Sequence, residues 1–290
     1  MTPMPPSPPV APPRSAQEKI RRAFSESSDP SGYVPRNATE VALSLIHGWA
    51  EETGLGSTVA ALMAEPGAGK TCLLRIFESQ LNAMPSSADR SDRVLYLPYA
   101  SLSISDLCIW IHGLLGRSFR LPDGNDQPAA ALSALLALAD EADEPFFLLL
   151  DDADSMPRET IDALTQGLPT ERSSLRILMA LNPDAKASRL LAALDPLHPR
   201  LVELQGVMSD AETGHYLYAR MRWAGFTEDE IAQMDSETVS QIYTRSGGLP
   251  RRIHTVAAAF FEAAGAGLPP ELGEKQKRED WMGRPIEEDL

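Results

Sequence analysis

A lysine and a threonine follow a glycine-rich segment in an order that suits the binding of phosphate. Phosphate groups need several N–H donors close together and a fixed positive charge. A tight glycine turn at the start of a helix supplies both, through bare backbone amides and aligned peptide dipoles. We therefore expect one continuous segment to bind a phosphate ligand, made of Ala64, Glu65, Pro66, Gly67, Ala68, Gly69, Lys70, Thr71 and Cys72.

The spacing of this segment matches the pattern GxxxxGK followed by Ser or Thr, except that Ala64 replaces the opening glycine. In this pattern Lys70 reaches the β- and γ-phosphates of a nucleotide, and the hydroxyl of Thr71 coordinates Mg²⁺. Cys72 falls in the first turn of the following helix, where the dipole could activate a thiol, although a small packing residue is the commoner role. The pattern predicts a site for ATP with Mg²⁺.

Two acids close a continuous apolar run, FFLLLDDAD, later in the chain. Mg²⁺ prefers few carboxylates together with water and phosphate oxygens, which suits one acid at the end of a buried strand beside the loop. Asp151 is therefore expected to hold the metal together with Thr71. Asp152 would then act as the base for the attacking water or orient it, a role that requires an acceptor within hydrogen-bond reach. A core strand that ends in a solvated turn is the alternative interpretation.

Strand and helix patterns alternate around these residues. The run STVAALM leads through the loop into a helix pattern with Leu73, Leu74, Ile76 and Phe77. Further strands are expected in VLYLPYA, PFFLLL, SLRILMALNP and RLVELQG. Strands that alternate with helices favour a parallel sheet with right-handed crossovers. We predict an α/β fold with a parallel five-stranded sheet flanked by helices. A helix before the first strand should have Asn37 as its N-cap and carry Val41, Leu45, Ile46 and Trp49 on one face.

Helix patterns replace the strands after Gly206. Capping boxes at Ser209 and Thr227 are expected to open helices that end near Gly225 and Ser246, and an apolar helix follows LPRR. These helices would make a small all-helical lid domain. We divide the chain into a disordered proline-rich arm at 1–32, a P-loop core at 33–207, the lid at 208–267 and a flexible polar tail at 268–290.

The bulk composition fits an average soluble protein, with 43% hydrophobic and 23% charged residues in a chain of 290. The net charge of -15 repels phosphate backbones, so nucleic-acid binding would need a local basic patch such as Arg245, Arg251 and Arg252. Two cysteines are too few for a disulfide framework, and no apolar run is long enough to span a membrane. A cytoplasmic location is therefore expected.

The loop, the acidic strand and the helical end of the chain together resemble the AAA+ branch of P-loop ATPases, over roughly residues 33 to 264. The resemblance implies three further site residues. Asn182 matches the polar sensor that orients the attacking water, and Arg200 matches the arginine finger that reaches the γ-phosphate of a neighbouring subunit. Arg251 matches the second sensor arginine on the lid. Positive charges of this kind stabilise a transferring phosphoryl group.

Each of these three residues also has a plainer interpretation. Asn182 precedes a proline and suits a turn, Arg200 suits a solvated loop charge, and Arg251 suits a helix cap or a salt bridge. Arg189 and Arg252 are the substitutes if either arginine assignment is displaced.

Two segments resemble a narrower group within the class. SGGLPRRI and the upstream YVPRNATEVALSLI are similar to ExeA-type secretion ATPases and TniB-like transposition ATPases, with a lid of the ORC type. This resemblance implies that Tyr33 to Pro35 border the adenine. The AAA+ pattern normally has Glu where Asp152 stands, and the acid pair together with GLP also resembles the STAND signalling NTPases, which act as slow switches. The missing methylene could slow hydrolysis without changing binding.

Three hypotheses for function stay open at this point. The first is an ATPase whose binding and hydrolysis of ATP drive assembly of a homo-oligomer or remodelling of a protein partner that the sequence does not identify. The second is an ATP-loaded switch or scaffold with slow or no hydrolysis. The third is a DNA-acting regulator of the transposition type, which the negative charge disfavours.

Overall fold

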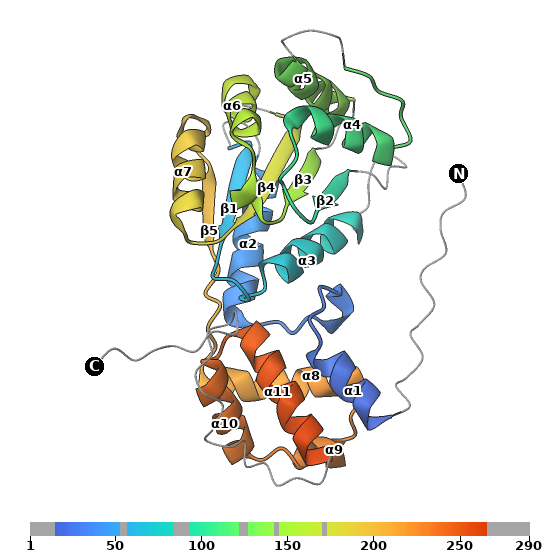
Figure 1. Ribbon diagram of the computed structural model, residues 1–290, viewed down its shortest axis with the longest axis vertical. Coiled ribbons are helices and arrows are strands. Elements are labelled where there is room, and N and C mark those ends of the chain that lie inside the picture. Colours follow the sequence, from blue (N-terminus) through green and yellow to red (C-terminus); the bar gives the residue numbers. More distant parts are fainter. Residues whose placement is uncertain are drawn as a thin grey trace, which may run out of the picture.

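Five parallel strands form the central sheet of the larger domain, as the computed structural model of the chain shows (Figure 1). The structure describes residues 15–52, 57–83, 93–121, 127–141, 145–169 and 173–265. The strands are β1 (Val59–Met63), β2 (Val94–Leu97), β3 (Phe146–Leu150), β4 (Leu175–Leu181) and β5 (Arg200–Glu203). Their order across the sheet is β2-β3-β4-β1-β5, and all neighbours are parallel. The predicted five-stranded parallel sheet is confirmed.

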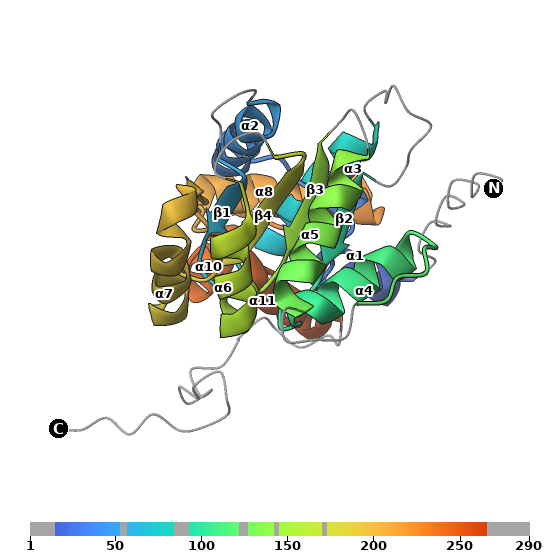
Figure 2. The same ribbon diagram turned by 90° about the horizontal axis from the view of Figure 1, so that it is seen from above.

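Helices cover both faces of this sheet (Figure 2). One face packs against α2 (Asn37–Glu51) and α3 (Lys70–Ala83), and the other against α4 (Ile104–Leu114), α5 (Gln127–Asp140), α6 (Arg158–Gly167) and α7 (Ala185–Leu194). Short 3-10 helices follow β3 and precede β5, namely η2 (Ala153–Ser155) and η3 (Asp195–Leu197). Every residue of β3 and β4 is buried, because these central strands have a helical layer on each side.

The apolar face of α2 differs from the predicted one. Ile46 and Trp49 are buried as expected, but Val41 and Leu45 are 51% and 39% exposed, and the smaller Ala42 is buried near the start of the helix. Helix α2 lies over β1 and the edge strand β5. Only the strip of the helix above the sheet is therefore covered, and two apolar side chains remain on its outer side.

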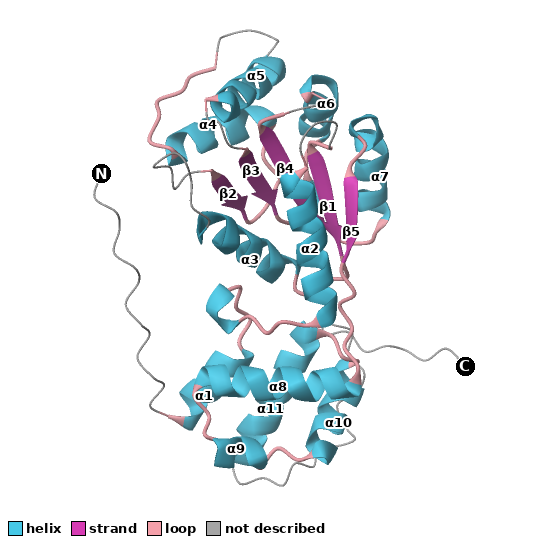
Figure 3. Ribbon diagram, turned by 180° about the vertical axis from the view of Figure 1, so that it is seen from behind, coloured by secondary structure: helices cyan, strands magenta, loops and turns pink. Residues whose placement is uncertain are grey.

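Helices follow the sheet and form a helical domain (Figure 3). They are α8 (Asp210–Ala224), α9 (Glu228–Ala232), α10 (Ser236–Ser246) and α11 (Pro250–Gly265). Capping boxes at Ser209 and Thr227 open α8 and α9 as predicted. The single helix predicted from Thr227 to about Ser246 is wrong. Asp235 starts a new helix there, because its side chain accepts a hydrogen bond from the amide of Thr238.

The prediction of a disordered arm over residues 1–32 is wrong for residues 15–32. This part of the chain, which we call the N-terminal segment, forms α1 (Ala16–Phe24) and the 3-10 helix η1 (Pro30–Gly32). Helix α1 lies beside α8 and α11 (Figure 1) and buries Ile20, Ala23 and Phe24 in the core of the helical domain. A short isolated helix is marginal in water, and its packed apolar face stabilises it here.

A buried arginine fastens the N-terminal segment to the helical domain. Arg220 of α8 is 3% exposed, and its guanidinium donates to Ala23 O at 2.9 Å and Gly32 O at 2.6 Å. The guanidinium carbons of Arg22 and Arg220 lie 4.7 Å and 4.6 Å from the centroid of the Trp223 ring. Backbone carbonyls and an aromatic face thus stabilise a charge that is otherwise costly to bury.

Several predictions concern parts of the chain outside the described residues. These parts are residues 1–14 of the predicted arm, residues 266 and 267 of the predicted lid, and the predicted tail at 268–290. The predicted boundary between residues 207 and 208 falls in the link between β5 and α8. Within the described ranges, no helix combines the length and apolar character needed to cross a membrane.

The packing of α1 leads to a test of the N-terminal segment. Phe24 is 4% exposed and stacks on Phe261 with ring centroids 5.5 Å apart. Phe24→Ala should lower the free energy of unfolding by about 3–5 kcal/mol, because it removes a large buried ring. Urea denaturation followed by tryptophan fluorescence measures this change. Gln17→Ala, on the exposed side of α1, is the matched control, and equal stabilities of the two variants would contradict the packing.

Candidate phosphate-binding site

The glycine-rich segment forms a loop between β1 and α3. Gly67 and Gly69 have φ angles of 86° and 105°, which other residues rarely adopt. A Cβ atom on Gly67 would also lie 2.8 Å from the Cβ of Arg251 in α11. Helix α3 begins at Lys70, so the free amides of its first turn lie next to the loop, an arrangement that attracts anions.

The ammonium group of Lys70 is the charged centre of this loop. The residue is 7% exposed, and burial lowers the pKa of its amine. Its Nζ atom donates to Ala64 O at 2.7 Å, Glu65 O at 3.2 Å and Asn182 Oδ1 at 2.8 Å. Three oxygen acceptors thus replace water around the buried charge. Asn182 follows β4, so the order of the strands brings two predicted site residues into direct contact.

The carboxylate of Asp151 lies at the carboxyl end of β3 and faces the start of α3. Its Oδ2 atom accepts a hydrogen bond from Thr71 Oγ1 at 2.6 Å and another from the Tyr96 hydroxyl at 3.0 Å. Asp151 is 4% exposed. The two residues predicted to hold a metal ion, Asp151 and Thr71, are therefore in direct contact.

Asp152 and Asp154 place two more carboxylates beside this pair. Asp152 has a left-handed backbone with φ of 46°, and its amide donates to Asp151 Oδ1 at 3.1 Å. Burial raises the pKa of the Asp152 carboxyl, and the negative charges of Asp151 and Asp154 raise it further. A raised pKa makes the carboxylate a better proton acceptor. Asp154 Oδ2 accepts a hydrogen bond of 2.7 Å from Asn182 Nδ2, so Asn182 bridges Lys70 and Asp154.

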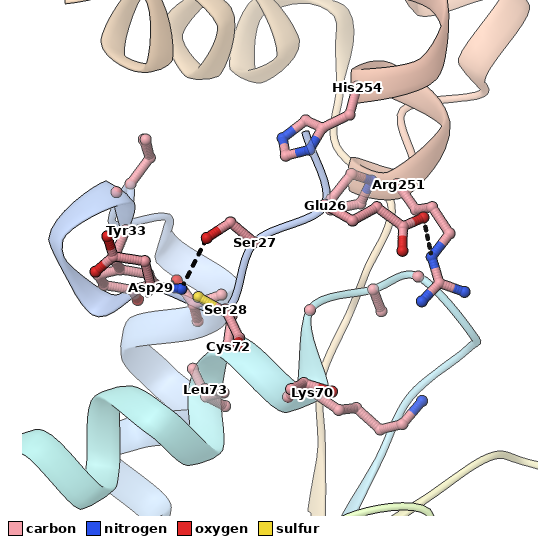
Figure 4. A pocket seen from close by; sticks show the side chains of 18 of the residues that line it. Glu26, Ser27, Ser28, Asp29, Tyr33, Lys70, Cys72, Leu73, Arg251 and His254 are labelled. Atoms are coloured by element: carbon pink, nitrogen blue, oxygen red, sulfur yellow. Dashed lines mark hydrogen bonds and ion pairs between the residues drawn. The ribbon is translucent and has the colours of Figure 1, made fainter. Parts of the chain in front are cut away.

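These groups line one side of a cavity of about 500 Å³, which we call the interdomain cavity. The sheet domain supplies residues 66–73 together with Asp151, Asp152 and Asn182. The helical domain supplies the opposite side with Tyr216, Arg220, Pro250, Arg251 and His254. The N-terminal segment and the residues after it supply a third wall with Glu26, Ser27, Ser28, Asp29, Gly32, Tyr33 and Val34 (Figure 4). The predicted residues Ala64 and Glu65 do not line the cavity and meet Lys70 only through their carbonyls.

Arg251 connects the helical domain to the loop. Its backbone amide donates to Gly67 O at 3.2 Å. Its guanidinium pairs with Glu26 of the N-terminal segment at 3.1 Å, on the side of the cavity that faces Lys70 across the opening (Figure 4). Both side chains are more than half exposed, so the pair contributes little stability by itself. The predicted place of Arg251 at the cavity therefore agrees with the structure, and its role stays a prediction.

Arg200 lies away from the cavity. It starts β5, where it pairs with Ala60 near the start of β1, whereas the glycine loop follows the other end of β1. Its side chain is exposed and does not line the cavity. The two substitutes, Arg189 and Arg252, are exposed and do not line it either. Within one chain, Arg251 is the predicted arginine that reaches the site.

Cys72 lines the cavity near the predicted adenine border. Burial raises the pKa of its thiol, which disfavours the thiolate, so the structure supports the packing role rather than activation by the dipole. Tyr33 and Val34 line the cavity as predicted, whereas Pro35 does not. Arg36 also lines it and donates to Gly206 O at 3.2 Å in the link between the two domains.

Sequence reasoning missed the part of the third wall before Tyr33 and several other residues of the site. The missed residues share no motif, and they are Glu26, Ser27, Ser28, Asp29, Tyr96, Asp154, Tyr216, Arg220 and His254. One pattern could have revealed the helix that precedes this wall. Ser15 and Glu18 form a capping box at the start of α1, and the sequence SAQE has the spacing expected for it.

The geometry suits a ligand that carries several phosphates and a divalent cation. Lys70 and the free amides of α3 offer positive charge and donors, while Asp151 and Thr71 offer the oxygen ligands that Mg²⁺ prefers. One carboxylate and one hydroxyl leave coordination positions for water and phosphate oxygens. The residues present therefore fit a phosphate-bound magnesium ion.

Comparison with known proteins agrees with this geometry. Residues 55–189 match the model of a family described as an AAA domain. The fold is similar to Cdc6p from Pyrobaculum aerophilum, with a TM-score of 0.61 and 18% identity over 86% of this chain and 67% of that one. It is also similar to Drosophila ORC bound to DNA, with a TM-score of 0.52 and 14% identity over 91% and 64% of the two chains.

A Walker-type ATPase of Pyrococcus abyssi gives a TM-score of 0.50 and 15% identity over 79% of this chain and 68% of that one. The chain thus spans about two thirds of the length of these solved structures. No curated protein matches the sequence. The predicted resemblance to AAA+ P-loop proteins agrees with the AAA-domain match over residues 55–189, and the fold is similar to that of the Cdc6p and ORC structures.

His254 gives the cavity wall a pH dependence that can be measured. Burial and the nearby charge of Arg220 lower the pKa of His254 to about 4, so the folded chain keeps the ring neutral while the unfolded chain protonates it near pH 6.5. Between pH 7 and pH 5 wild type should therefore lose about 2 kcal/mol more stability than His254→Gln. Urea denaturation of both proteins at the two pH values measures this difference. Equal losses would contradict the neutral buried ring.

Proposed function

We propose that this chain is an AAA+ P-loop protein with an ORC-like architecture, and that it binds ATP with Mg²⁺ in the interdomain cavity. One observation carries the proposal: residues from three separate segments meet at the start of α3 as two hydrogen-bonded pairs, Lys70 with Asn182 and Thr71 with Asp151. Such convergence of a cation, a hydroxyl and a carboxylate at a helix start suits a triphosphate.

Each residue has a chemical role in this proposal. Lys70 and the amides of residues 67–71 bind the β- and γ-phosphates, and Thr71 and Asp151 hold Mg²⁺, which supplies charge neutralisation at the phosphates when it is bound. Asp152 accepts the proton of the attacking water, and Asn182 orients that water from the end of β4. Arg251 contributes a second positive charge from the helical domain.

Assembly into a homo-oligomer is part of the proposal. Arg200 lies too far along β5 to act on the nucleotide of its own chain, whereas it is free to meet the site of a neighbour. Two apolar surfaces lie at opposite edges of the sheet. One is formed by Val41 and Leu45 on the outer side of α2, near the β5 edge, and the other by Ile109, Trp110 and Leu114 on α4, near the β2 edge. A head-to-tail contact would cover both, since exposed apolar patches mark interaction sites.

Loss of the lysine tests nucleotide binding. Lys70→Ala should weaken binding of a fluorescent ATP analogue by roughly 100-fold, because removing a charged hydrogen-bond donor costs about 2–3 kcal/mol. Fluorescence titration measures the Kd, and circular dichroism verifies the fold. Lys186→Ala, an exposed lysine on α7, is the matched control. Unchanged affinity in Lys70→Ala would refute the site.

The concentration dependence of phosphate release tests the oligomer. Wild type should release more phosphate per subunit as its concentration rises, because each active site would need a neighbour's Arg200. Arg200→Ala should be slower by about a thousandfold or more, as for other arginine fingers. Arg158→Ala, also an exposed arginine of the sheet domain, is the control. A rate per subunit that depends on neither concentration nor Arg200 would exclude assembly of this kind.

A slow ATP-loaded switch is the second candidate, and Asp152 favours it. Asp152 is shorter by one methylene than the Glu expected at this position, and its backbone is held in a left-handed conformation with φ of 46°. A loss of reach lowers the rate of hydrolysis more than the affinity. The same measurement separates the candidates, since release below about one phosphate per hour is far slower than typical enzymes at 1–10³ per second.

A further inference from the structure

The carboxylate of Asp151 has a hydrogen-bond donor that the proposed function does not use. Its Oδ2 atom accepts from Thr71 Oγ1 at 2.6 Å, and its Oδ1 atom accepts from the amide of Asp152 at 3.1 Å. The third donor is the Tyr96 hydroxyl, 3.0 Å from Oδ2. Three donors from three elements therefore fix both oxygens of a single carboxylate.

The parallel pairing of β2 with β3 places Tyr96 at this carboxylate. Tyr96 pairs with Leu149, and Leu150 pairs with Leu97. Alternate residues of a strand point to the same face of the sheet, so Leu149 and Asp151 both face α3, and Tyr96 lies diagonally next to Asp151 on that face. The amide of Asp151 donates to Leu97 O at 2.9 Å, which keeps the two strand ends in register.

An arginine holds the ring of Tyr96 in place. The guanidinium carbon of Arg75, on α3, lies 3.6 Å from the centroid of the Tyr96 ring. Arg75 is held in turn by Glu78, one turn further along α3, at 2.8 Å. The Tyr96 ring therefore extends from β2 and packs against Arg75 of α3, and this contact fixes the position of the hydroxyl next to Asp151. Such a contact between a cation and the face of an aromatic ring is attractive, so it favours one orientation of the ring.

We infer that Tyr96 is a positioning residue for the magnesium ligand Asp151, held in its orientation by Arg75. A monodentate ligand must present one oxygen in a fixed direction, and Mg²⁺ demands near-ideal octahedral geometry. Residues that hydrogen-bond to a metal ligand fix the orientation of that ligand. Losing such a residue weakens metal binding by roughly 10- to 100-fold. This inference rests on the proposed binding of ATP with Mg²⁺.

The test is the Mg²⁺ dependence of nucleotide binding in Tyr96→Phe. This variant keeps the ring, its packing and its contact with Arg75, and removes only the hydroxyl. The Kd for a fluorescent ATP analogue is measured in EDTA and over a series of Mg²⁺ concentrations. We expect the Kd in EDTA to equal that of wild type. The Mg²⁺ concentration that gives half of the Mg²⁺-dependent gain in affinity should be about tenfold higher than for wild type. Tyr99→Phe is the matched control, because Tyr99 is 61% exposed just after β2, and it should behave as wild type.

Arg75→Ala is the second variant, because it leaves the hydroxyl but frees the ring. Its Mg²⁺ requirement should rise less than that of Tyr96→Phe, with the same Kd in EDTA. If Tyr96→Phe failed to fold by circular dichroism, Arg75→Ala would decide the proposal by the same criterion.

The outcomes separate this inference from the proposed function. In one outcome, wild type binds the analogue more tightly with Mg²⁺, and Tyr96→Phe needs the same Mg²⁺ concentration as wild type. This result overturns the role of Tyr96 and leaves the proposed function standing. Equal weakening in EDTA and in Mg²⁺ assigns Tyr96 a merely structural role and also overturns it. Wild type that binds no analogue under either condition overturns the proposed function and this inference with it.

Discussion

The buried ammonium group of Lys70 must be surrounded by oxygen atoms, and much of the site follows from that requirement. A charge with 7% exposure is stable only where acceptors replace its water. Two acceptors are carbonyls of the loop itself, and the third is the side chain of Asn182 at the end of β4. Because β1 lies between β4 and β5 in the sheet, the loop after β1 and the residue after β4 are neighbours in space. The parallel topology therefore makes the charge possible at this place.

The same carboxyl edge of the sheet gathers negative charge next to the lysine. Three acidic residues follow β3, namely Asp151, Asp152 and Asp154. Asn182 joins this acidic cluster to Lys70, because it accepts a hydrogen bond from Lys70 and donates one to Asp154. The negative groups raise the pKa of Lys70 while burial lowers it, and burial is the larger effect. A site that holds both signs of charge in contact suits a ligand that carries both, such as a phosphate chain with its metal ion.

The walls of the cavity formed by the helical domain and the N-terminal segment depend on contacts between segments far apart in the sequence. Arg220 of α8 holds the carbonyls of Ala23 and Gly32, and Arg36 holds the carbonyl of Gly206 between the domains. A Cβ atom on Gly206 would lie 2.5 Å from the Cβ of Ala68, so the link between the domains touches the phosphate loop. The loop and the link to the helical domain are therefore in direct contact, and the N-terminal segment belongs to the helical domain because α1 shares its core.

The sequence by itself determined the features that depend on local pattern. The five strands, the glycine loop before Lys70, the acid after FFLLL and the capping boxes at Ser209 and Thr227 all follow from residues close together in the chain. Only the tertiary structure decided the rest. The composition of residues 15–32 favours coil, and α1 forms because Ile20, Ala23 and Phe24 find an apolar surface on helices more than 180 residues away. Tyr96, Asp154, Arg220 and His254 likewise carry no local motif. Their places depend on strand register and domain packing, which are set by contacts that a pattern of neighbouring residues does not contain.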